Sequence, residues 1–299
     1  MSLRRVLKTS ATGVVGSLSR ALSGPCRLAA EMGVPWRVPI LAYHQVAECG
    51  GPTGYAWRVT PAAFEAQMRW LAEGGYQVLS LGEFLRDRDE GRLRPRSVVL
   101  TFDDGFRGVL LHAYPVLKRY GFPATLFLAT GSMGRPEFPW VRHWLRGDED
   151  PQEYRPLSWD EIRGLDSAVV ELGSHTVSHP HLGRLPPKKM EEELTESRRQ
   201  IETETGRAVR FLAYPGGIAR YADHSPETRR VLMATGYSAA LVSEVGRNGP
   251  SADRFTLRRL GVGVDDSVGV FGAKVVGAYS WVRAVQSVGH RLLADAASY

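Results

Sequence analysis

The sequence predicts an α/β fold in which a parallel sheet of about seven strands closes, or nearly closes, into a barrel within a single domain. From Val38 onward, short apolar runs alternate with longer helical patterns, which is typical of βα units. Roughly seven such units fit a closed barrel better than an open sheet. The 299 residues are 43% hydrophobic and 23% charged, so the chain can bury the core that this fold needs.

Short apolar runs mark the predicted strands, and each is expected to be buried in the sheet. They lie at 38–43, 97–102, 124–129, 169–174, 209–214, 238–242 and 256–262. Because helical patterns separate these runs, consecutive strands are expected to lie parallel.

The predicted helices begin and end at residues that favour helix termini. For the helix at 61–73, Thr60 is placed to cap the N-terminus and Pro61 fits the first helical position. Further helices are predicted at 108–120, 158–165, 187–205 and 226–235, and glycines end several of them. Residues 131–155 lack periodicity and predict a long inserted loop, whereas 268–288 predicts an amphipathic helix started by Asp266 or Ser267.

The barrel is expected over 36–265, with one extension before it at 1–35 and another after it at 266–299. The first is a basic arm, either poorly ordered or an amphipathic helix that associates weakly with a membrane surface. Its apolar stretch is not clean enough for a secretion signal, so a cytoplasmic or membrane-peripheral location is favoured over secretion. The last is a helical extension, and no apolar run in the sequence is long enough to span a membrane.

Composition argues against two function classes. The net charge of +6 comes with arginines spread along the chain, so nucleic-acid binding is not expected. The two cysteines, Cys26 and Cys49, form no Cys-x-x-Cys pair, which excludes a zinc finger.

Polar motifs directly follow several predicted strands. His44 follows the first, Asp103 and Asp104 the second, His175 the fourth and Tyr214 the fifth. The carboxyl ends of parallel strands meet at one rim of a βα barrel, where active sites are built. We therefore expect these motifs to converge on one site.

Asp103 and Asp104 leave their strand as adjacent carboxylates. Adjacent side chains point in different directions, so one can bind a cation while the other stays free to act as a base. Gly105 lets the backbone turn sharply at this point. On these residues alone, an aspartate pair that caps the following helix is an equally good interpretation.

His175 and His179 are spaced i, i+4, so one helical turn would bring both imidazoles to the same face. Two imidazoles and one carboxylate form a metal-ligand set with positions left open for water. The alternative is a solvated, histidine-rich turn. His181 follows Pro180, and we assign it no role.

These motifs resemble those of the polysaccharide deacetylases of the NodB-homology type, carbohydrate esterase family 4. Residues 101–105 match the family's T-F-D-D-G motif, and 175–180 match its H-[ST]-x-x-H-P motif. Residues 211–217 look like the Y-P-x-G variant of its third motif. The segment 40–46 is similar to the Y-H-x-[IV] start of the exopolysaccharide-modifying branch, and the resemblance covers roughly 38–263.

The resemblance implies a distorted (β/α)7-type barrel and a metal-dependent mechanism. Asp104, His175 and His179 would hold a divalent metal, commonly zinc in this family, which lowers the pKa of a bound water. Asp103 would then accept a proton from that water as it attacks the acetamide carbonyl.

The third motif implies an oxyanion site. Backbone N–H groups in the stretch Tyr214, Pro215 and Gly216 would stabilise the tetrahedral oxyanion.

The chain departs from the commonest family pattern at three places. The late L-x-H motif, which supplies the acid histidine, corresponds to 257–260 and contains no histidine. The resemblance to the exopolysaccharide branch assigns the general acid to His44, with a structural histidine as the alternative. The arginine of the common third motif aligns with Ala213, which leaves Arg210 as the candidate for its contact to the catalytic aspartate. The aromatic-plus-aspartate fourth motif is not recognisable.

The resemblance implies a hydrolase that removes N-acetyl groups from amino-sugar units, with a bacterial exopolysaccharide or a lipid-linked precursor as substrate. Arg107, Trp140 and Trp144 are expected to contact sugar. One alternative is a deacylase of another ester or amide, such as an O-acetylated sugar or a small acylated amine. A non-catalytic carbohydrate-binding barrel is the other, and the complete set of ligands and base argues against it.

Overall fold

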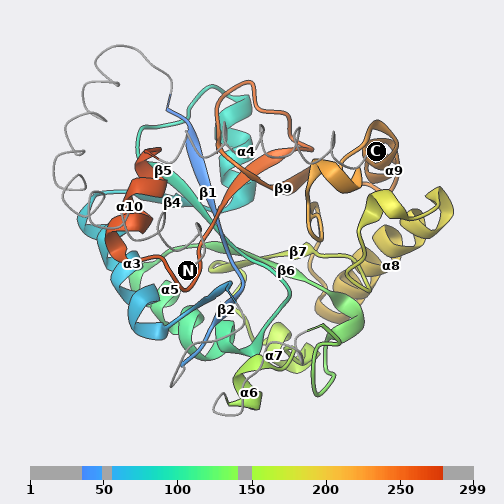
Figure 1. Cartoon of the computed structure of the whole chain (residues 1–299), viewed down its shortest axis with the longest axis horizontal. Coiled ribbons are helices and arrows are strands. Elements are labelled where there is room, and N and C mark those ends of the chain that lie inside the picture. Colours follow the sequence, from blue (N-terminus) through green and yellow to red (C-terminus); the bar gives the residue numbers. More distant parts are fainter. Residues whose placement is uncertain (1–35, 49–55, 141–149, 279–299) are drawn as a thin grey trace, which may run out of the picture.

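The computed structural model describes residues 36–48, 56–140 and 150–278, and all structural statements below concern these residues. The basic arm predicted at 1–35 lies outside them, as does the part of the C-terminal extension after residue 278. In Figure 1 the strands occupy the centre of the molecule and the helices surround them. Within the described residues, no helix has the length and hydropathy of a membrane span.

A ring of parallel strands forms the barrel. Its members are β1 (Val38–Tyr43), β5 (Ser97–Phe102), β6 (Ala124–Leu128), β7 (Val170–Ser174), β8 (Phe211–Ala213), β9 (Ala239–Val245) and β11 (Leu257–Gly261). The order of neighbours is β1-β11-β9-β8-β7-β6-β5, and β5 pairs back to β1 from Ile40 opposite Val99 to Tyr43 opposite Phe102. The predicted (β/α)7-type barrel is thus confirmed, and each predicted apolar run supplies one of its strands.

Short strands and two helices were not predicted. These are β2 (Gln45–Val46), β3 (Arg58–Val59), β4 (Gln77–Leu79), β10 (Arg247–Asn248), α4 (Leu81–Asp89) and α6 (Pro151–Tyr154), the last within the stretch predicted as a loop. The strands are too short to produce an apolar run, and α4 is strongly charged. The sequence did carry a signal for α4, because Ser80 and Glu83 form a capping box at its start.

The remaining helices lie around the outside of the barrel (Figure 1). They are α3 (Pro61–Glu73), α5 (Tyr114–Tyr120), α7 (Trp159–Arg163), α8 (Pro187–Thr205), α9 (Pro226–Ala234) and α10 (Val268–Val276), with single 3-10 turns at Thr130–Ser132, Leu182–Arg184 and Ala219–Tyr221. Thr60 caps α3 as predicted, and Ser267 rather than Asp266 caps α10.

The helix predicted at 108–120 is not uniform. Its first part, Val109–Ala113, is a π-helical turn, and only Tyr114–Tyr120 is α-helical. Pro115 lies at the junction and has no N–H to donate to the preceding turn, which accounts for the altered hydrogen bonding there.

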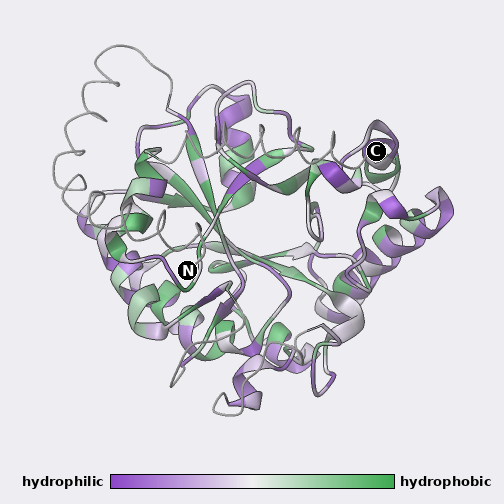
Figure 2. Ribbon diagram, in the orientation of Figure 1, coloured by the Kyte–Doolittle hydropathy of each residue, from purple (hydrophilic) through white to green (hydrophobic). Residues whose placement is uncertain are grey.

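Two apolar layers hold the barrel together. Alternate strand residues such as Ile40, Val99 and Phe127 face the interior of the barrel, together with Phe84 of α4. The residues between them, such as Leu41, pack against the surrounding helices. Figure 2 shows this arrangement as hydrophobic strands inside a ring of helices with hydrophilic outer faces. The carboxyl ends of the parallel strands therefore share one rim, which carries the site described next.

Candidate metal centre and active site

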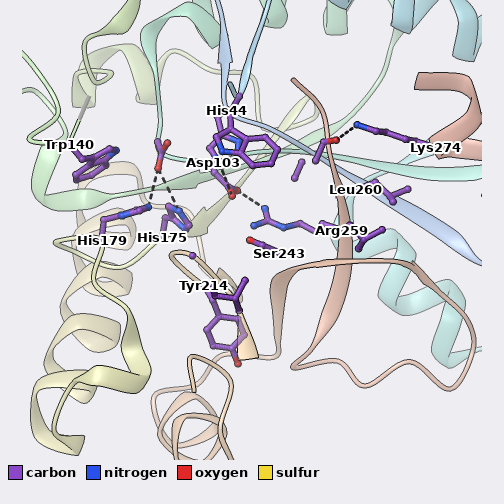
Figure 3. A pocket seen from close by; sticks show the side chains of 17 residues that line it. His44, Asp103, Trp140, His175, His179, Tyr214, Ser243, Arg259, Leu260 and Lys274 are labelled. Carbon is purple, nitrogen blue, oxygen red and sulfur yellow. Dashed lines mark hydrogen bonds and ion pairs between the residues drawn. The ribbon is translucent and has the colours of Figure 1, made fainter. Parts of the chain in front are cut away.

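The predicted site residues meet in a cavity of about 550 Å³ at the rim of the barrel (Figure 3). Its lining includes His44, Asp103, Asp104, His175, His179, Tyr214, Gly216 and Arg259. The expectation that motifs at separate strand ends converge is therefore correct in geometry. The volume is within the range of roughly 300–1,000 Å³ that small-molecule sites occupy.

Asp104, His175 and His179 are arranged as ligands of one metal ion. Asp104 Oδ1 lies 3.6 Å from His175 Nε2 and 3.5 Å from His179 Nε2. These separations are too long for hydrogen bonds. They match the distance of roughly 3.4 Å between ligands of a tetrahedral ion with bonds of about 2.1 Å. The residues present thus fit a divalent metal.

The backbone at the end of β5 separates the two carboxylates. Asp103 still donates its N–H to Tyr43 O at 3.0 Å, so it continues the pairing of β5 with β1. Asp104 then adopts a left-handed conformation with φ of 72°, which is uncommon for a residue other than glycine. This turn sends Asp104 toward the imidazoles while Asp103 stays at the centre of the barrel.

The segment that carries His175 and His179 is not helical, so the predicted helical turn is wrong. Thr176 and His179 instead adopt left-handed conformations, with φ of 64° and 60°. For a β-branched residue this conformation is strained. Hydrogen bonds compensate: Thr176 Oγ1 donates to His175 O at 2.6 Å and accepts the His179 N–H at 3.1 Å. Glu193 of α8 holds the next residue by accepting the Val177 N–H at 2.8 Å.

Neighbouring groups orient both imidazoles. His175 Nδ1 lies 2.7 Å from Ala213 O, which places a proton on Nδ1 and leaves Nε2 as the ligand atom. The ring of Trp140 stacks on His179 at 4.5 Å between centroids. Burial lowers the pKa of His175, and burial together with the nearby His175 lowers the pKa of His179 to about 3. Both rings are therefore neutral at physiological pH, as metal ligands must be.

Arg259 holds the second carboxylate. Its Nη1 donates to Asp103 Oδ1 at 2.7 Å, its Nε donates to Val242 O at 3.2 Å, and both side chains are buried. Burial alone would raise the pKa of Asp103, but the charge of Arg259 outweighs it and lowers the pKa well below its ordinary range. Asp103 is thus an ionised acceptor inside an apolar barrel.

Arg259 was not predicted from the sequence, which offered Arg210 as an open candidate for this contact. Arg210 is 3.5 Å from Glu171 and its side chain is 58% exposed, so it does not take the predicted role. Arg259 lies on β11, in the stretch that lacks the late histidine, and the two adjacent arginines Arg258 and Arg259 within a predicted strand were the available signal. The missing third-motif arginine is replaced from a different strand.

His44 lies on the other side of Asp103. Its Nε2 is 3.8 Å from Asp103 Oδ2, and the imidazole stacks on Trp57 with 5.4 Å between centroids. Burial lowers the pKa of His44 to about 4, although the charge of Asp103 opposes that shift. The imidazole is therefore neutral in the resting enzyme.

The loop predicted to stabilise the oxyanion has most of its N–H groups engaged or absent. The Tyr214 N–H donates to Leu241 O at 3.0 Å within the sheet, and Pro215 has no N–H. The Gly217 N–H donates to Pro215 O at 2.8 Å. Among the described residues, Gly216 is thus the member of this loop whose N–H has no acceptor, and it lines the cavity.

The sugar contacts predicted from sequence have different outcomes. Arg107 donates to Glu161 at 2.8 Å and is not among the described residues that line the cavity, so the structure does not place it for substrate binding. Trp140 does line the cavity. Trp144 lies outside the described residues.

Comparisons with known proteins agree with this geometry. Residues 90–240 match the family model described as polysaccharide deacetylase. The chain is 28% identical to YxkH of Bacillus subtilis (strain 168) over 242 residues, which cover 81% of this chain and 77% of that protein. It is 26% identical to the poly-beta-1,6-N-acetyl-D-glucosamine N-deacetylase of Staphylococcus aureus (strain MSSA476), and it spans 61% of that enzyme's length.

Solved structures share the fold. The deacetylase PplD of Streptococcus pyogenes, in complex with acetate, superposes with a TM-score of 0.67 at 22% identity, covering 81% of this chain and 99% of that one. IcaB from Ammonifex degensii superposes with a TM-score of 0.64 at 24% identity, covering 80% and 97%.

Proposed function

Because the chain belongs to the polysaccharide deacetylase family, we propose that it removes N-acetyl groups from β-linked amino-sugar units of a bacterial exopolysaccharide or of its lipid-linked precursor. The named staphylococcal relative supports an amino-sugar polymer as the substrate class. The reaction breaks the amide C–N bond and yields acetate and a free amine.

One observation carries the proposal. Adjacent carboxylates diverge at the end of β5, so that Asp104 faces two imidazoles at 3.5–3.6 Å while Asp103 faces Arg259 and His44. A metal-binding group and a separate ionised base thus stand side by side in one cavity (Figure 3). This is the arrangement that metal-assisted hydrolysis requires.

Asp104, His175 and His179 would hold the metal, and we propose zinc, since two imidazoles and one carboxylate are typical ligands of catalytic zinc. Such an ion lowers the pKa of a bound water and polarises the acetyl carbonyl. Asp103 accepts the proton of the attacking water. Arg259 occupies Oδ1 of Asp103, which leaves Oδ2 as the accepting atom.

Gly216 contributes to charge stabilisation. Gly216 lines the cavity, and its N–H is the donor of this loop that is left to bond the developing oxyanion. Gly216 has a φ of 69°, and a Cβ added there would clash with the imidazole of His181, so glycine is required at this position.

His44 completes the proton transfer. Because its pKa is lowered to about 4, the resting imidazole carries no proton to donate at neutral pH. We propose that it receives the proton that Asp103 has taken from water, across the 3.8 Å between Nε2 and Oδ2, which one small movement of either side chain would close, and delivers it to the leaving amine. The sequence-based assignment as general acid is thereby retained with a different proton source.

The deciding experiment measures metal content together with acetate and amine release. Purified protein is analysed for bound metal, stripped by chelation and reloaded with zinc. N-acetylglucosamine oligomers and an O-acetylated xylan oligomer are then compared as substrates. We expect one metal per chain and equal amounts of acetate and new amine from the amino-sugar oligomers alone. Acetate from the O-acetylated oligomer only would replace the proposal with an ester deacylase.

A further inference from the structure

Trp57 is an exposed aromatic side chain at the edge of the catalytic cavity. It lines the cavity and is 46% exposed, and each of the other described tryptophans is less exposed. An aromatic side chain at the edge of a cavity is a typical part of a ligand-binding surface. The mechanism above makes no use of this surface.

The backbone holds Trp57 in a fixed position. Its carbonyl accepts the Gln45 N–H at 3.4 Å, and the preceding Ala56 carbonyl accepts the Val264 N–H at 3.1 Å. The residues that follow form β3, which pairs with β2 next to His44. The loop is thus tied to the segments after both β1 and β11.

The neighbours of the indole are shaped to receive it. The imidazole of His44 stacks on it with an interplanar angle of 19°. Gly261 lies directly against the six-membered ring, and a Cβ at Gly261 would stand 2.5 Å from Cζ3 of Trp57. A rigid aromatic surface of this kind binds without a large loss of conformational entropy.

We propose that Trp57 is the stacking platform for a sugar unit that flanks the unit being deacetylated. The inference rests on the proposed function, because the occupant is the next pyranose ring of the same polymer. Pyranose rings with equatorial substituents present apolar C–H faces, which pack on aromatic rings while their hydroxyls stay in water. The reacting acetamide lies between Asp103 and the metal ligands, so Trp57, beyond His44, meets a neighbouring unit.

The arrangement predicts a dependence on chain length. A monomer of N-acetylglucosamine fills the catalytic position only, whereas longer oligomers also reach Trp57. In the wild-type enzyme, kcat/KM should therefore rise with length from one to five units. Trp57→Ala should reduce this rise in kcat/KM by a factor of about ten, mainly by raising KM for the longer oligomers. Trp57→Phe should restore most of the rise.

The ratio of kcat/KM for the pentamer to that for the monomer is the decisive quantity. If Trp57 served only to support His44, Trp57→Ala would lower both values equally and leave the ratio unchanged, which would overturn the proposal. Met233→Ala is the matched control, because Met233 is another exposed apolar side chain, 58% exposed and not among the cavity-lining residues.

A binding measurement separates this inference from the proposed function. Calorimetric titration with the N-acetylglucosamine pentamer is done in the zinc-loaded Asp103→Asn background, in which turnover is abolished. Binding should be about tenfold tighter with Trp57 present than with Trp57→Ala added. If the wild type releases no acetate but binds the pentamer through Trp57, the proposed reaction fails and the sugar platform stands. Equal affinity in both proteins overturns the platform.

Discussion

The two halves of the active site are built by different means. The ligand half, Asp104, His175 and His179, comes from two short motifs whose backbones turn sharply within a few residues. The base half, Asp103, His44 and Arg259, is assembled from the ends of β5 and β1 and the middle of β11. Backbone strain positions the ligands, whereas a buried ion pair positions the base.

Backbone strain and long-range pairing are seen at different residues of the structure. Most of the non-glycine residues in left-handed conformations among the described residues belong to the ligand half: Asp104, Thr176 and His179, with Arg96 and Ala222 elsewhere. The contact between Arg259 and Asp103, in contrast, joins residues that are 156 positions apart. Local motifs can therefore encode the turns that carry the ligands, although the two motifs still have to meet in the barrel, whereas the base half has no motif that joins Arg259 to Asp103.

The largest effects are expected from substitutions in the base and in the ligands, and the metal content of the variants distinguishes the two halves. Asp103→Asn should abolish turnover, with a loss of at least about 10³-fold in kcat, and should keep the metal. His175→Ala should lose both activity and metal, because one ligand of three is gone. Metal analysis of both variants checks this. Loss of metal from Asp103→Asn would place Asp103 among the ligands and erase the distinction between the halves.

His44→Ala tests the far end of the base half. We expect kcat to fall by about 10²–10⁴-fold, as is typical when a general acid is removed. Metal content should be unchanged, since His44 lies beyond Asp103 from the ligands. Steady-state kinetics on an N-acetylglucosamine oligomer provide the measurement, and an unaltered kcat would remove His44 from the mechanism.

Arg259→Met tests whether the ion pair positions the base. Misplacing a catalytic group by about 1 Å costs around 10²-fold, and we expect a loss of that size in kcat/KM. Without the Arg259 charge, burial raises the pKa of Asp103, so the pH below which activity is lost should move upward.

Arg210→Met is the matched control for this change. Arg210 is exposed and paired with Glu171, so its loss should leave the pH profile unchanged. Because an unpaired buried carboxylate can cost about 3–5 kcal/mol of stability, Arg259→Lys is measured alongside. Arg259→Lys keeps the positive charge, so the pH below which activity is lost should return to the wild-type value, although kcat stays reduced. A wild-type profile in Arg259→Met would show that the pair is structural only.

The smallest effect is expected outside both halves, in the network around Glu161. Burial raises the pKa of Glu161, but hydrogen bonds from Arg155, the Ser158 N–H and Arg107 outweigh it and lower the pKa to about 2. A carboxylate whose folded pKa is lowered stabilises the fold above its unfolded pKa, and that stability is lost as the pH falls toward about 2.

Glu161→Gln should therefore reduce the free energy of unfolding at pH 7 by about 1 kcal/mol, after allowance for solvent screening. Denaturant titrations at pH 7 and near pH 2 provide the measurement. The difference between variant and wild type should shrink at the lower pH, and metal content should stay normal. A loss of metal from this variant would show that the segment around Glu161 helps to hold the metal ligands, which would contradict its place outside both halves.

Sequence patterns were sufficient for the barrel strands and for the ligand half. Apolar runs separated by helical patterns are a local signal, and each run became a strand with boundaries shifted by a few residues. The short β4 was missed because three residues produce no periodicity. The turn at His175 was predicted as helical because an i, i+4 spacing cannot distinguish a helical turn from a left-handed bend.

By itself, the sequence determined which residues carry the chemistry: the paired aspartates, the paired histidines and His44, each at the end of an apolar run. Only the tertiary structure decided which arginine holds Asp103, which amide of the third motif remains available, and that Arg107 pairs with Glu161. These outcomes depend on which strands become neighbours when β5 pairs with β1 and the barrel closes. A contact between distant residues has no local signature, because its energy arises only once both partners are buried together.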